Sequence, residues 1–269
     1  MGDLLGSYLR TRISLGDDEI YLTGLSRVEA LAAARRVGTV GLSTPAASMP
    51  PEPRASAEAA GTELERLSAG ATGEEVRALP DLPTLDAVAQ GCTRCGLHGT
   101  RRSVVFGEGD PRARLVCVGE APGAREDETG RPFVGRAGKL LDRLLLAVGF
   151  QRDEVFICNV LKCRPPQNRN PQSDEIEACS PFLLRQIELI EPDVIVAFGG
   201  FAAQTLLQTK ESIGRLRGRT HLYEGFKLVV TYHPAALLRN PRWTRKSWED
   251  LQGARRLVDD SQPAVTNDG

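Results

Sequence analysis

The chain of 269 residues lacks long apolar runs, and aromatic side chains make up only 5% of it. A membrane-spanning helix needs about 18 or more consecutive apolar residues, so no membrane span is expected. The opening stretch, MGDLLGSYLRTR, has no apolar segment of the kind that a secretory signal requires. These absences indicate a cytoplasmic protein, in which the six cysteines stay reduced and serve metal binding or chemistry before disulfides.

Nucleotide-binding motifs are also missing. The glycine-rich stretch at residues 119–142, GEAPGAREDETGRPFVGRAGKLLD, ends in a segment that resembles a phosphate-binding loop. Walker A requires a glycine where the chain has Phe133 and a serine or threonine where it has Leu140. The dinucleotide fingerprint fails as well, so this stretch is not expected to bind a nucleoside triphosphate.

The net charge of −1 is low but unevenly distributed. Residues 1–91 carry 8 basic and 13 acidic side chains, whereas residues 92–256 carry 26 and 19. A basic central part between acidic ends suits a polyanion such as nucleic acid. An ordinary solvated surface explains the same numbers equally well.

The sequence of the N-terminal part indicates a partly disordered extension that precedes the main domain. Two plausible helices, at residues 4–13 and 27–37, precede a Pro/Ala/Ser-rich linker at 43–61. We place the boundary near residue 82. The predicted parts are an extension over 1–82, a main domain over 83–258 and a disordered tail over 259–269.

Apolar runs alternate with amphipathic segments through the main domain. The runs predict strands at 114–120, 154–160, 193–200 and 227–233. Helical spacing of leucines and capping residues predicts helices at 138–149, 173–190, 201–208 and 244–258, with Pro181 inside the second. This alternation predicts an α/β fold built on a doubly wound parallel sheet.

In such a sheet, functional residues gather where the strands end. The residues at the predicted ends are Gly119–Glu120, Asn159, Gly199–Gly200 and His233. A histidine after a strand often only caps a loop by bonding to the backbone. The shared edge favours a functional role for His233.

The cysteines divide into two groups. Cys117 and Cys158 lie inside apolar strands and predict small buried side chains. The other four, Cys92 and Cys95 in a CxxC knuckle, Cys163 and Cys179, form a plausible metal site. One knuckle with two separated cysteines favours an iron–sulfur cluster over zinc, whose four-cysteine sites usually show two knuckles, but the spacing leaves both open.

Five motifs occur in the order and spacing of one family. They are GEAPG at 119–123, ED at 126–127, GRPFVG at 130–135, NVLKC at 159–163 and HPAALLRNP at 233–241. From about residue 90 to 255, with the four cysteines, the chain resembles the family 4 (iron–sulfur, thermostable-type) uracil-DNA glycosylases. The resemblance does not reach residues 1–82. Whether this extension has a binding partner, and which, is unknown.

The resemblance implies a three-layer α/β/α sandwich with a central four-stranded parallel sheet. It also implies a 4Fe-4S cluster on Cys92, Cys95, Cys163 and Cys179. The implied activity is hydrolysis of the uracil–deoxyribose bond in single- or double-stranded DNA. We expect a monomer that associates with the nucleoid if the source is a prokaryote.

Uracil recognition needs an aromatic face and a reader for the base edge. Phe133 is suited to supply the face. The Asn159 amide is suited to accept from uracil N3–H and donate to O4, which rejects cytosine. Gly119 and Glu120 complete the predicted uracil pocket.

Bond cleavage places negative charge on uracil O2. The resemblance implies that His233 donates an N–H there, a contact worth about 3–4 kcal/mol. It also implies a minor-groove wedge at Leu237 and Leu238, although these leucines would serve equally well as helix packing. Arg239 and Asn240 are expected to hold flanking phosphates.

Two positions depart from the better-known family 1 enzymes, which carry a water-positioning aspartate and a thymine-excluding tyrosine. This chain has Ala121 and Gly123 at those positions. Glu120 and Glu126 are the available catalytic carboxylates. We favour Glu126 for ordering the loop or the water.

Two alternatives share the fold: a non-catalytic nucleic-acid-binding protein, and a glycosylase that traps uracil-DNA covalently through a histidine. The trapping relatives carry an extra basic, histidine-containing loop, and no such insertion follows GRPFVGRAGKLL. No lyase step is expected, because Lys162 beside Cys163 is predicted to face the cluster or the backbone.

Overall fold

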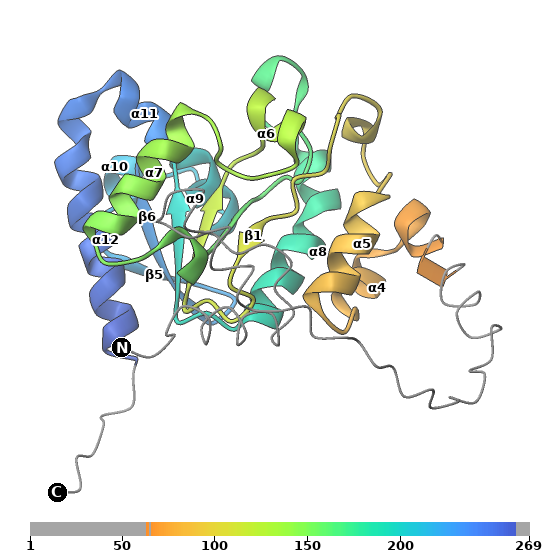
Figure 1. Ribbon diagram of the computed structural model, residues 1–269, viewed down its shortest axis with the longest axis horizontal. Helices are drawn as coiled ribbons and strands as arrows, with labels where there is room; N and C mark the ends of the chain where they lie inside the picture. Colours follow the sequence, from red (N-terminus) through yellow and green to blue (C-terminus); the bar gives the residue numbers. More distant parts are fainter. Residues whose placement is uncertain (1–62, 65, 262–269) are drawn as a thin grey trace, which may run out of the picture. The chain divides into compact units, whose positions relative to one another are not determined.

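The computed structural model of the chain describes residues 63, 64 and 66–261 (Figure 1). The predicted helices at 4–13 and 27–37, the predicted linker at 43–61 and most of the predicted tail lie outside these residues.

The sheet has six strands in the order β1-β3-β2-β4-β6-β5. Its centre is the predicted set of four parallel strands: β2 (Leu115–Gly119), β3 (Phe156–Asn159), β4 (Val194–Phe198) and β6 (Phe226–Thr231). The predicted count of four is too low, because an antiparallel strand flanks each edge: β1 (Glu108–Gly109) beside β3 and β5 (Thr220–Tyr223) beside β6. Strand β1 has only two residues, and the residues of β5 are exposed or half-buried, so neither strand contains an apolar run.

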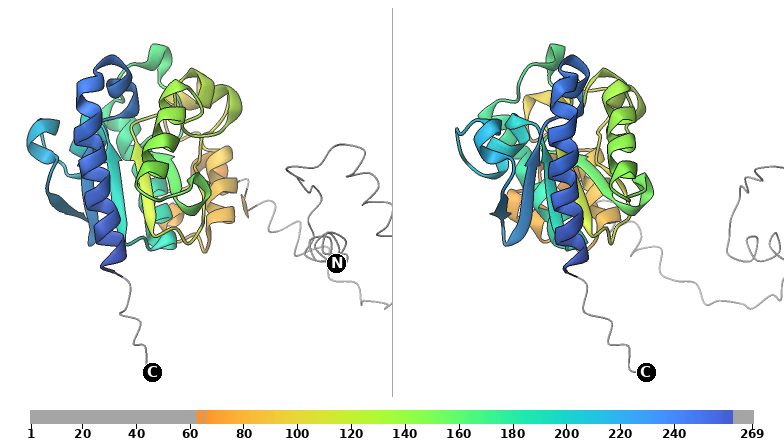
Figure 2. Two further views of the ribbon diagram at one scale, coloured as in Figure 1. Left: turned by 60° about the vertical axis from the view of Figure 1, so that its left-hand side comes forward. Right: turned by 90° about the vertical axis from the view of Figure 1, so that its left-hand side faces the viewer.

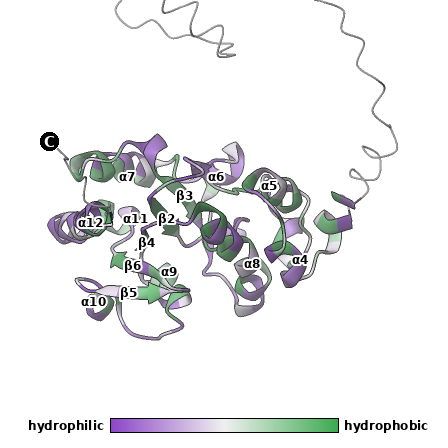
Figure 3. Cartoon of the chain, turned by 90° about the horizontal axis from the view of Figure 1, so that it is seen from below, coloured by the Kyte–Doolittle hydropathy of each residue, from purple (hydrophilic) through white to green (hydrophobic). Residues whose placement is uncertain are grey.

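The central strands are mostly apolar and buried because helices cover both faces of the sheet, as the three-layer prediction requires. Figure 3 shows α7 (Arg136–Ala147) and α12 (Thr244–Asp259) on one side of the strands, and α8 (Ser173–Ile190) and α9 (Gly200–Leu206) on the other. Side chains alternate between the two layers. Cys158 packs with the α8 layer and Cys117 with the α7 layer, and both are fully buried, as predicted.

Helix α12 lies along the outside of the sheet and α7 packs beside it (Figure 2). Helix α8 continues from Ser173 to Ile190 with Pro181 inside it. Further helices are α4 (Gly73–Arg77), α5 (Leu82–Gln90), α6 (Ala124–Thr129), α10 (Ile213–Leu216) and α11 (Pro234–Arg239). Single 3₁₀ turns occupy Gly96–Gly99, Arg152–Glu154, Pro166–Asn168 and Pro241–Trp243. Within residues 63, 64 and 66–261, no helix combines the length and apolarity needed to cross a bilayer.

Residues just before the predicted boundary at 82 pack against α8. Val76 and Leu79 are buried, and the Leu79 carbonyl accepts a 2.8 Å hydrogen bond from Arg185. Arg77 forms a 2.6 Å ion pair with Glu188. The boundary at 82 stays a prediction, and these contacts lead us to propose an earlier one, before residue 63.

Two truncations test the boundary. A protein that begins at residue 63 should melt at the temperature of the full chain. One that begins at residue 83 should melt about 10 °C lower, because it loses Val76 and Leu79, each worth about 1.5–3 kcal/mol. Thermal unfolding followed by circular dichroism measures the difference, and equal midpoints would support the boundary at 82.

Candidate active site

A cleft of about 630 Å³ opens where the parallel strands end. The loops after β2, β3, β4 and β6 line it, and α6 and α11 stand at this end of the sheet (Figure 1). This volume is within the range of small-molecule sites. The predicted site residues that line it are Glu120, Glu126, Phe133, Asn159, His233 and Arg239.

Phe133 adopts a left-handed backbone, with φ of 50°, which a bulky residue rarely does. Its ring stacks on His233 with centroids 5.4 Å apart and meets Phe198 edge-on at 6.3 Å. A Cβ on Gly138 would lie 1.6 Å from the Phe133 carbonyl oxygen, so only glycine fits there. The ring is therefore held in one orientation at the wall of the cleft.

Polar contacts fix the chain on both sides of Phe133. After it, Glu126 Oε1 accepts hydrogen bonds from the backbone N–H groups of Val134 (2.9 Å) and Gly135 (3.1 Å). Before it, Arg152 donates to the Pro132 carbonyl at 2.6 Å. The Arg152 guanidinium is itself held by Glu108 and Asp142, at 2.6 Å each. These contacts hold the unusual backbone of Phe133 without a ligand.

Asn159 is the last residue of β3 and is 2% exposed. It lies opposite Gly119 in the parallel register. A Cβ on Gly119 would lie 2.3 Å from Asn159 Oδ1 and 2.7 Å from Phe133 Cζ, so this glycine makes room for both side chains. Among the described residues, none forms a hydrogen bond with the Asn159 side-chain amide, which leaves its donor and acceptor for a ligand.

His233 caps the N-terminus of α11. Its Nδ1 accepts the Ala235 backbone N–H at 3.1 Å, so a neutral ring carries its proton on Nε2. Burial, with the nearby charge of Arg239, lowers the pKa of His233 to about 4, against a weaker opposite effect of Glu126. At neutral pH the side chain is therefore an uncharged N–H donor.

The two carboxylates in the cleft differ in their surroundings. Burial raises the pKa of Glu120, whereas Glu126 is engaged with the loop after Phe133. A Cβ on Gly123 would lie 2.8 Å from Glu126 Oε2, so the Glu126 carboxylate occupies the space that a larger residue at position 123 would need. This contact gives a physical reason for the glycine at that position.

The α11 residues divide by exposure. Leu237 is 1% exposed and packs in the core with α7 and α12, a position that does not suit the predicted entry into a DNA groove. Leu238 is 41% exposed, so the wedge prediction is kept for Leu238 alone. Arg239 and Asn240 are exposed beside it, as phosphate contacts require.

Sequence reasoning missed part of the cleft. Asn168, Arg169 and Asn170, in the loop between β3 and α8, line it, as does Trp243, which stacks on Tyr232 at 4.6 Å. The loop could have been found from the rule that identified the other residues, because it also follows a parallel strand. No pattern in the sequence marks Trp243.

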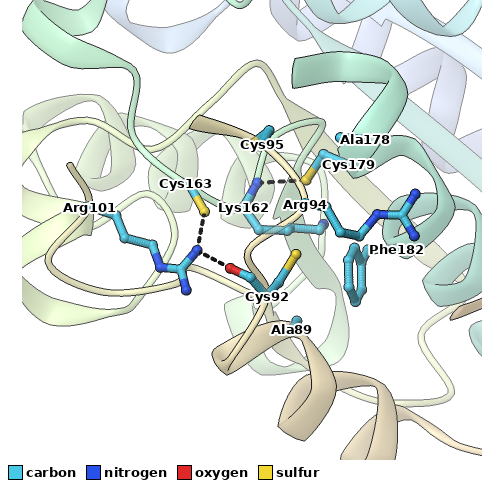
Figure 4. Close-up of a pocket in the computed structure, with 10 residues that line it drawn as sticks. All are labelled: Ala89, Cys92, Arg94, Cys95, Arg101, Lys162, Cys163, Ala178, Cys179 and Phe182. Atoms are coloured by element: carbon cyan, nitrogen blue, oxygen red, sulfur yellow. Dashed lines mark hydrogen bonds between the residues drawn. The ribbon is translucent and has the colours of Figure 1, made fainter. Parts of the chain in front are cut away.

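The four cysteines of the predicted metal site line a second cavity (Figure 4). Cys92 and Cys95 follow α5, Cys163 follows β3, and Cys179 lies in α8. Burial raises the pKa of the thiols of Cys95, Cys163 and Cys179. Thiolates form readily in such a place only when a metal compensates the charge.

The lining of this cavity suits an anionic group. Arg94 Nε is buried there and has no hydrogen-bond partner in the part of the chain that the structure describes. Arg101 donates to Cys163 Sγ and the Lys162 backbone N–H donates to Cys179 Sγ, both at 3.3 Å. Three donors around four thiols match a cluster whose thiolates and sulfides carry net negative charge.

A single metal ion fits less well. Among the described residues, no three His, Cys, Asp or Glu side chains are grouped to hold one ion. An iron–sulfur cluster binds each cysteine to a different iron and so holds the thiolates farther apart than one zinc ion does.

Comparison with known proteins places these features in a family. The family model of the Uracil DNA glycosylase superfamily matches residues 106–252. A Type-4 uracil-DNA glycosylase of Thermotoga maritima is 50% identical over 62% of this chain and 89% of that relative. One from Pyrobaculum aerophilum is 42% identical over 68% of this chain and its whole length. A Type-5 uracil-DNA glycosylase of the same organism is 32% identical, over 48% of this chain and 64% of its own.

Proposed function

The chain belongs to the Uracil DNA glycosylase superfamily, and from this premise we propose that it is a monofunctional uracil-DNA glycosylase of type 4. It flips uracil out of DNA and hydrolyses the N-glycosidic bond, leaving an abasic site for base excision repair. The observation that carries this proposal is the grouping of Phe133, Asn159 and His233 around one cleft. The alternatives, a non-catalytic binder or a covalent trap, are not favoured.

Recognition follows from the two fixed side chains. Flipping costs a few kcal/mol, which contacts in the pocket must offset. Phe133 offers a ring face that is already oriented, and the unengaged Asn159 amide accepts from N3–H and donates to O4. Cytosine presents the opposite pattern at these positions and is rejected.

Cleavage follows from the state of His233. Its Nε2–H is the only N–H of the neutral ring, because Nδ1 accepts from Ala235. As the bond between C1′ and N1 lengthens, charge accumulates on uracil O2, and this donor stabilises it more than it stabilises bound uracil. Catalysis therefore does not require a charged imidazole.

Water must then capture the sugar. Glu126 is engaged in ordering the loop after Phe133, whereas no described residue donates to the Glu120 carboxylate. We therefore assign loop positioning to Glu126 and water positioning to Glu120. No lysine is among the residues that line the cleft, and the Lys162 ammonium bonds to the Asn159 carbonyl at 2.9 Å, which supports hydrolysis without a lyase step.

The proposed substrate is uracil-containing DNA, single- or double-stranded, bound by a monomer. Leu238 fills the gap left by the flipped base, and Arg239 and Asn240 hold the neighbouring phosphates. Such phosphate contacts do not depend on the DNA sequence, which suits a protein associated with the nucleoid. They weaken as the salt concentration rises.

Cys92, Cys95, Cys163 and Cys179 would hold a 4Fe-4S cluster. When bound, it would supply a cross-link between the knuckle after α5, the chain after β3, and α8. The cysteine cavity and the cleft have no lining residue in common, although Lys162 and Cys163 in the one lie close in sequence to Asn159 and Pro165 in the other. The cluster is thus assigned a structural role.

Metal analysis tests the cluster. The purified protein should be brown and contain about four irons per chain. Cys163→Ala should lose most of the iron, whereas Cys117→Ala should keep it, because the Cys117 side chain packs on the opposite face of the sheet. Stoichiometric zinc in the wild-type protein would contradict the proposal.

Base excision tests the function. The protein is incubated with a uracil-containing single-stranded oligonucleotide and then treated with alkali, which cleaves abasic sites. Strand scission is expected. A complex that resists denaturation would indicate a trap, and intact DNA would indicate a binder.

Asn159→Asp tests the base reader in the same assay. A carboxylate cannot donate to O4, so we expect at least a tenfold loss of kcat/KM on uracil and weaker selection of uracil. Unchanged kinetics would show that Asn159 is structural.

A further inference from the structure

The backbone carbonyl of Asn159 lies at a gap in the sheet. Strand β1 pairs Glu108 with Ile157, and continuing this antiparallel register would place Phe106 opposite Asn159. The ladder does not include that pair, because β1 begins only at Glu108. Without another partner, the carbonyl groups of Asn159 and Phe106 would be buried and unpaired, at a cost of about 1–3 kcal/mol each.

Two side chains bridge this gap. The Lys162 ammonium donates to the Asn159 carbonyl at 2.9 Å and to Gln186 Oε1. Gln186 Nε2 donates to the Phe106 carbonyl at 2.9 Å. The bridge thus joins the two carbonyl groups that a further rung of the ladder would have brought together.

The bridge is buried and carries a charge. Lys162 is 2% exposed and Gln186 is 0% exposed. In the described part of the chain, no carboxylate lies within ion-pair distance of the Lys162 ammonium, so its acceptors are uncharged oxygens. A buried ammonium is costly, and an apolar residue of similar size would avoid that cost. A lysine at position 162 is explained if the hydrogen bonds that hold these carbonyl groups matter more than the folding stability that burial of the ammonium costs.

We propose that Lys162 and Gln186 are positioning residues that set the orientation of Asn159 for selecting uracil. The Asn159 carbonyl and side chain share one Cα, so fixing the carbonyl limits how far the amide can turn. A displacement of about 1 Å at a reacting group can cost on the order of 10² in rate. This inference rests on the proposed role of Asn159 as the base reader.

The experiment compares Gln186→Met with Gln186→Glu, two side chains of similar length. Both variants lose the donor to the Phe106 carbonyl, but the glutamate keeps an acceptor for the Lys162 ammonium and methionine does not, so their difference isolates the half of the bridge that holds Asn159. Gln186→Met should raise KM for a uracil oligonucleotide and weaken inhibition by free uracil, each by about tenfold or more. Gln186→Glu should stay within about threefold of wild type in both.

Lys162→Met should show the same change as Gln186→Met, and the double variant should be no worse than either, because one bridge is broken in each case. Lys210→Met is the control, since Lys210 is exposed and lines neither the cleft nor the cysteine cavity. Because Lys162 also lines the cysteine cavity, iron per chain is measured in every variant. Iron content and binding to abasic DNA should match wild type in all of them. A general loss of packing would instead lower the melting temperature and leave uracil inhibition unchanged.

Asn159→Asp in the same assays separates the two proposals. If Asn159→Asp weakens uracil binding and both Gln186 variants behave as wild type, the bridge is not a positioning device. Equal loss in the methionine and glutamate variants would overturn it as well. If Asn159→Asp itself changes nothing, the proposed role of Asn159 fails, and the bridge inference fails with it.

Discussion

His233→Ala should lower the single-turnover rate of uracil release by about 10²–10³, the usual effect of removing one oxyanion donor. The neutral ring has its Nδ1 engaged by Ala235 and offers Nε2–H to the cleft. That donor acts on charge that exists only while the bond breaks, so binding of the DNA should change little. Rapid-quench kinetics with enzyme in excess give the rate, and fluorescence anisotropy gives the affinity.

His221→Ala is the matched control, because His221 lies in the edge strand β5 and bonds to the Leu216 carbonyl. It should cleave at the wild-type rate. The pH dependence gives a second check: with the pKa of His233 lowered to about 4, its ring stays neutral on acidification from pH 8 to 5. Protonation of His233 should therefore cause no loss of rate in that range. A wild-type rate in His233→Ala would reduce the residue to a helix cap.

Gly119→Ala should remove most of the activity without unfolding the protein. The added methyl group would lie 2.3 Å from Asn159 Oδ1 and 2.7 Å from Phe133 Cζ, so both side chains must move. Because displacements of about 1 Å in an active site cost on the order of 10², we expect kcat/KM to fall by at least that factor.

Gly70→Ala is the control for this substitution, since an added Cβ there meets nothing within 4 Å. Both variants should keep the far-ultraviolet circular dichroism of the wild type. Near-normal kcat/KM in a folded Gly119→Ala protein would mean that the base does not sit between Phe133 and Asn159.

The central sheet was predictable because most of its strand residues are buried on both faces, which makes the strands largely apolar runs. Asn159 and His233 were predictable for a related reason: parallel strands end at one edge. The edge strands were not, because β1 has two residues and β5 faces solvent on alternate positions. The runs of apolar residues in the sequence thus indicate burial rather than strand propensity.

Contacts between distant parts of the chain were beyond prediction. Arg152 and Glu108 are 44 residues apart and act on Phe133 through a backbone carbonyl, which no local motif encodes. The burial of Leu237 beside the exposed Leu238 depends on how α11 packs against α7. Such side chains acquire their roles only when the layers of the sandwich come together.

The alternation of side chains through the sheet has an evolutionary consequence. Phe133 packs in the layer of α7 and α12, whereas the four cysteines pack in the layer of α5 and α8. Apart from Lys162 and Gln186, whose bridge reaches the Asn159 carbonyl, substitutions in the cysteine layer are therefore separated from the base pocket by the thickness of the sheet. Related proteins should be able to vary the cysteine layer, or to lose its metal, and still keep the chemistry. The condition is that Lys162 and Gln186, or groups that replace them, hold the carbonyl of Asn159 in place.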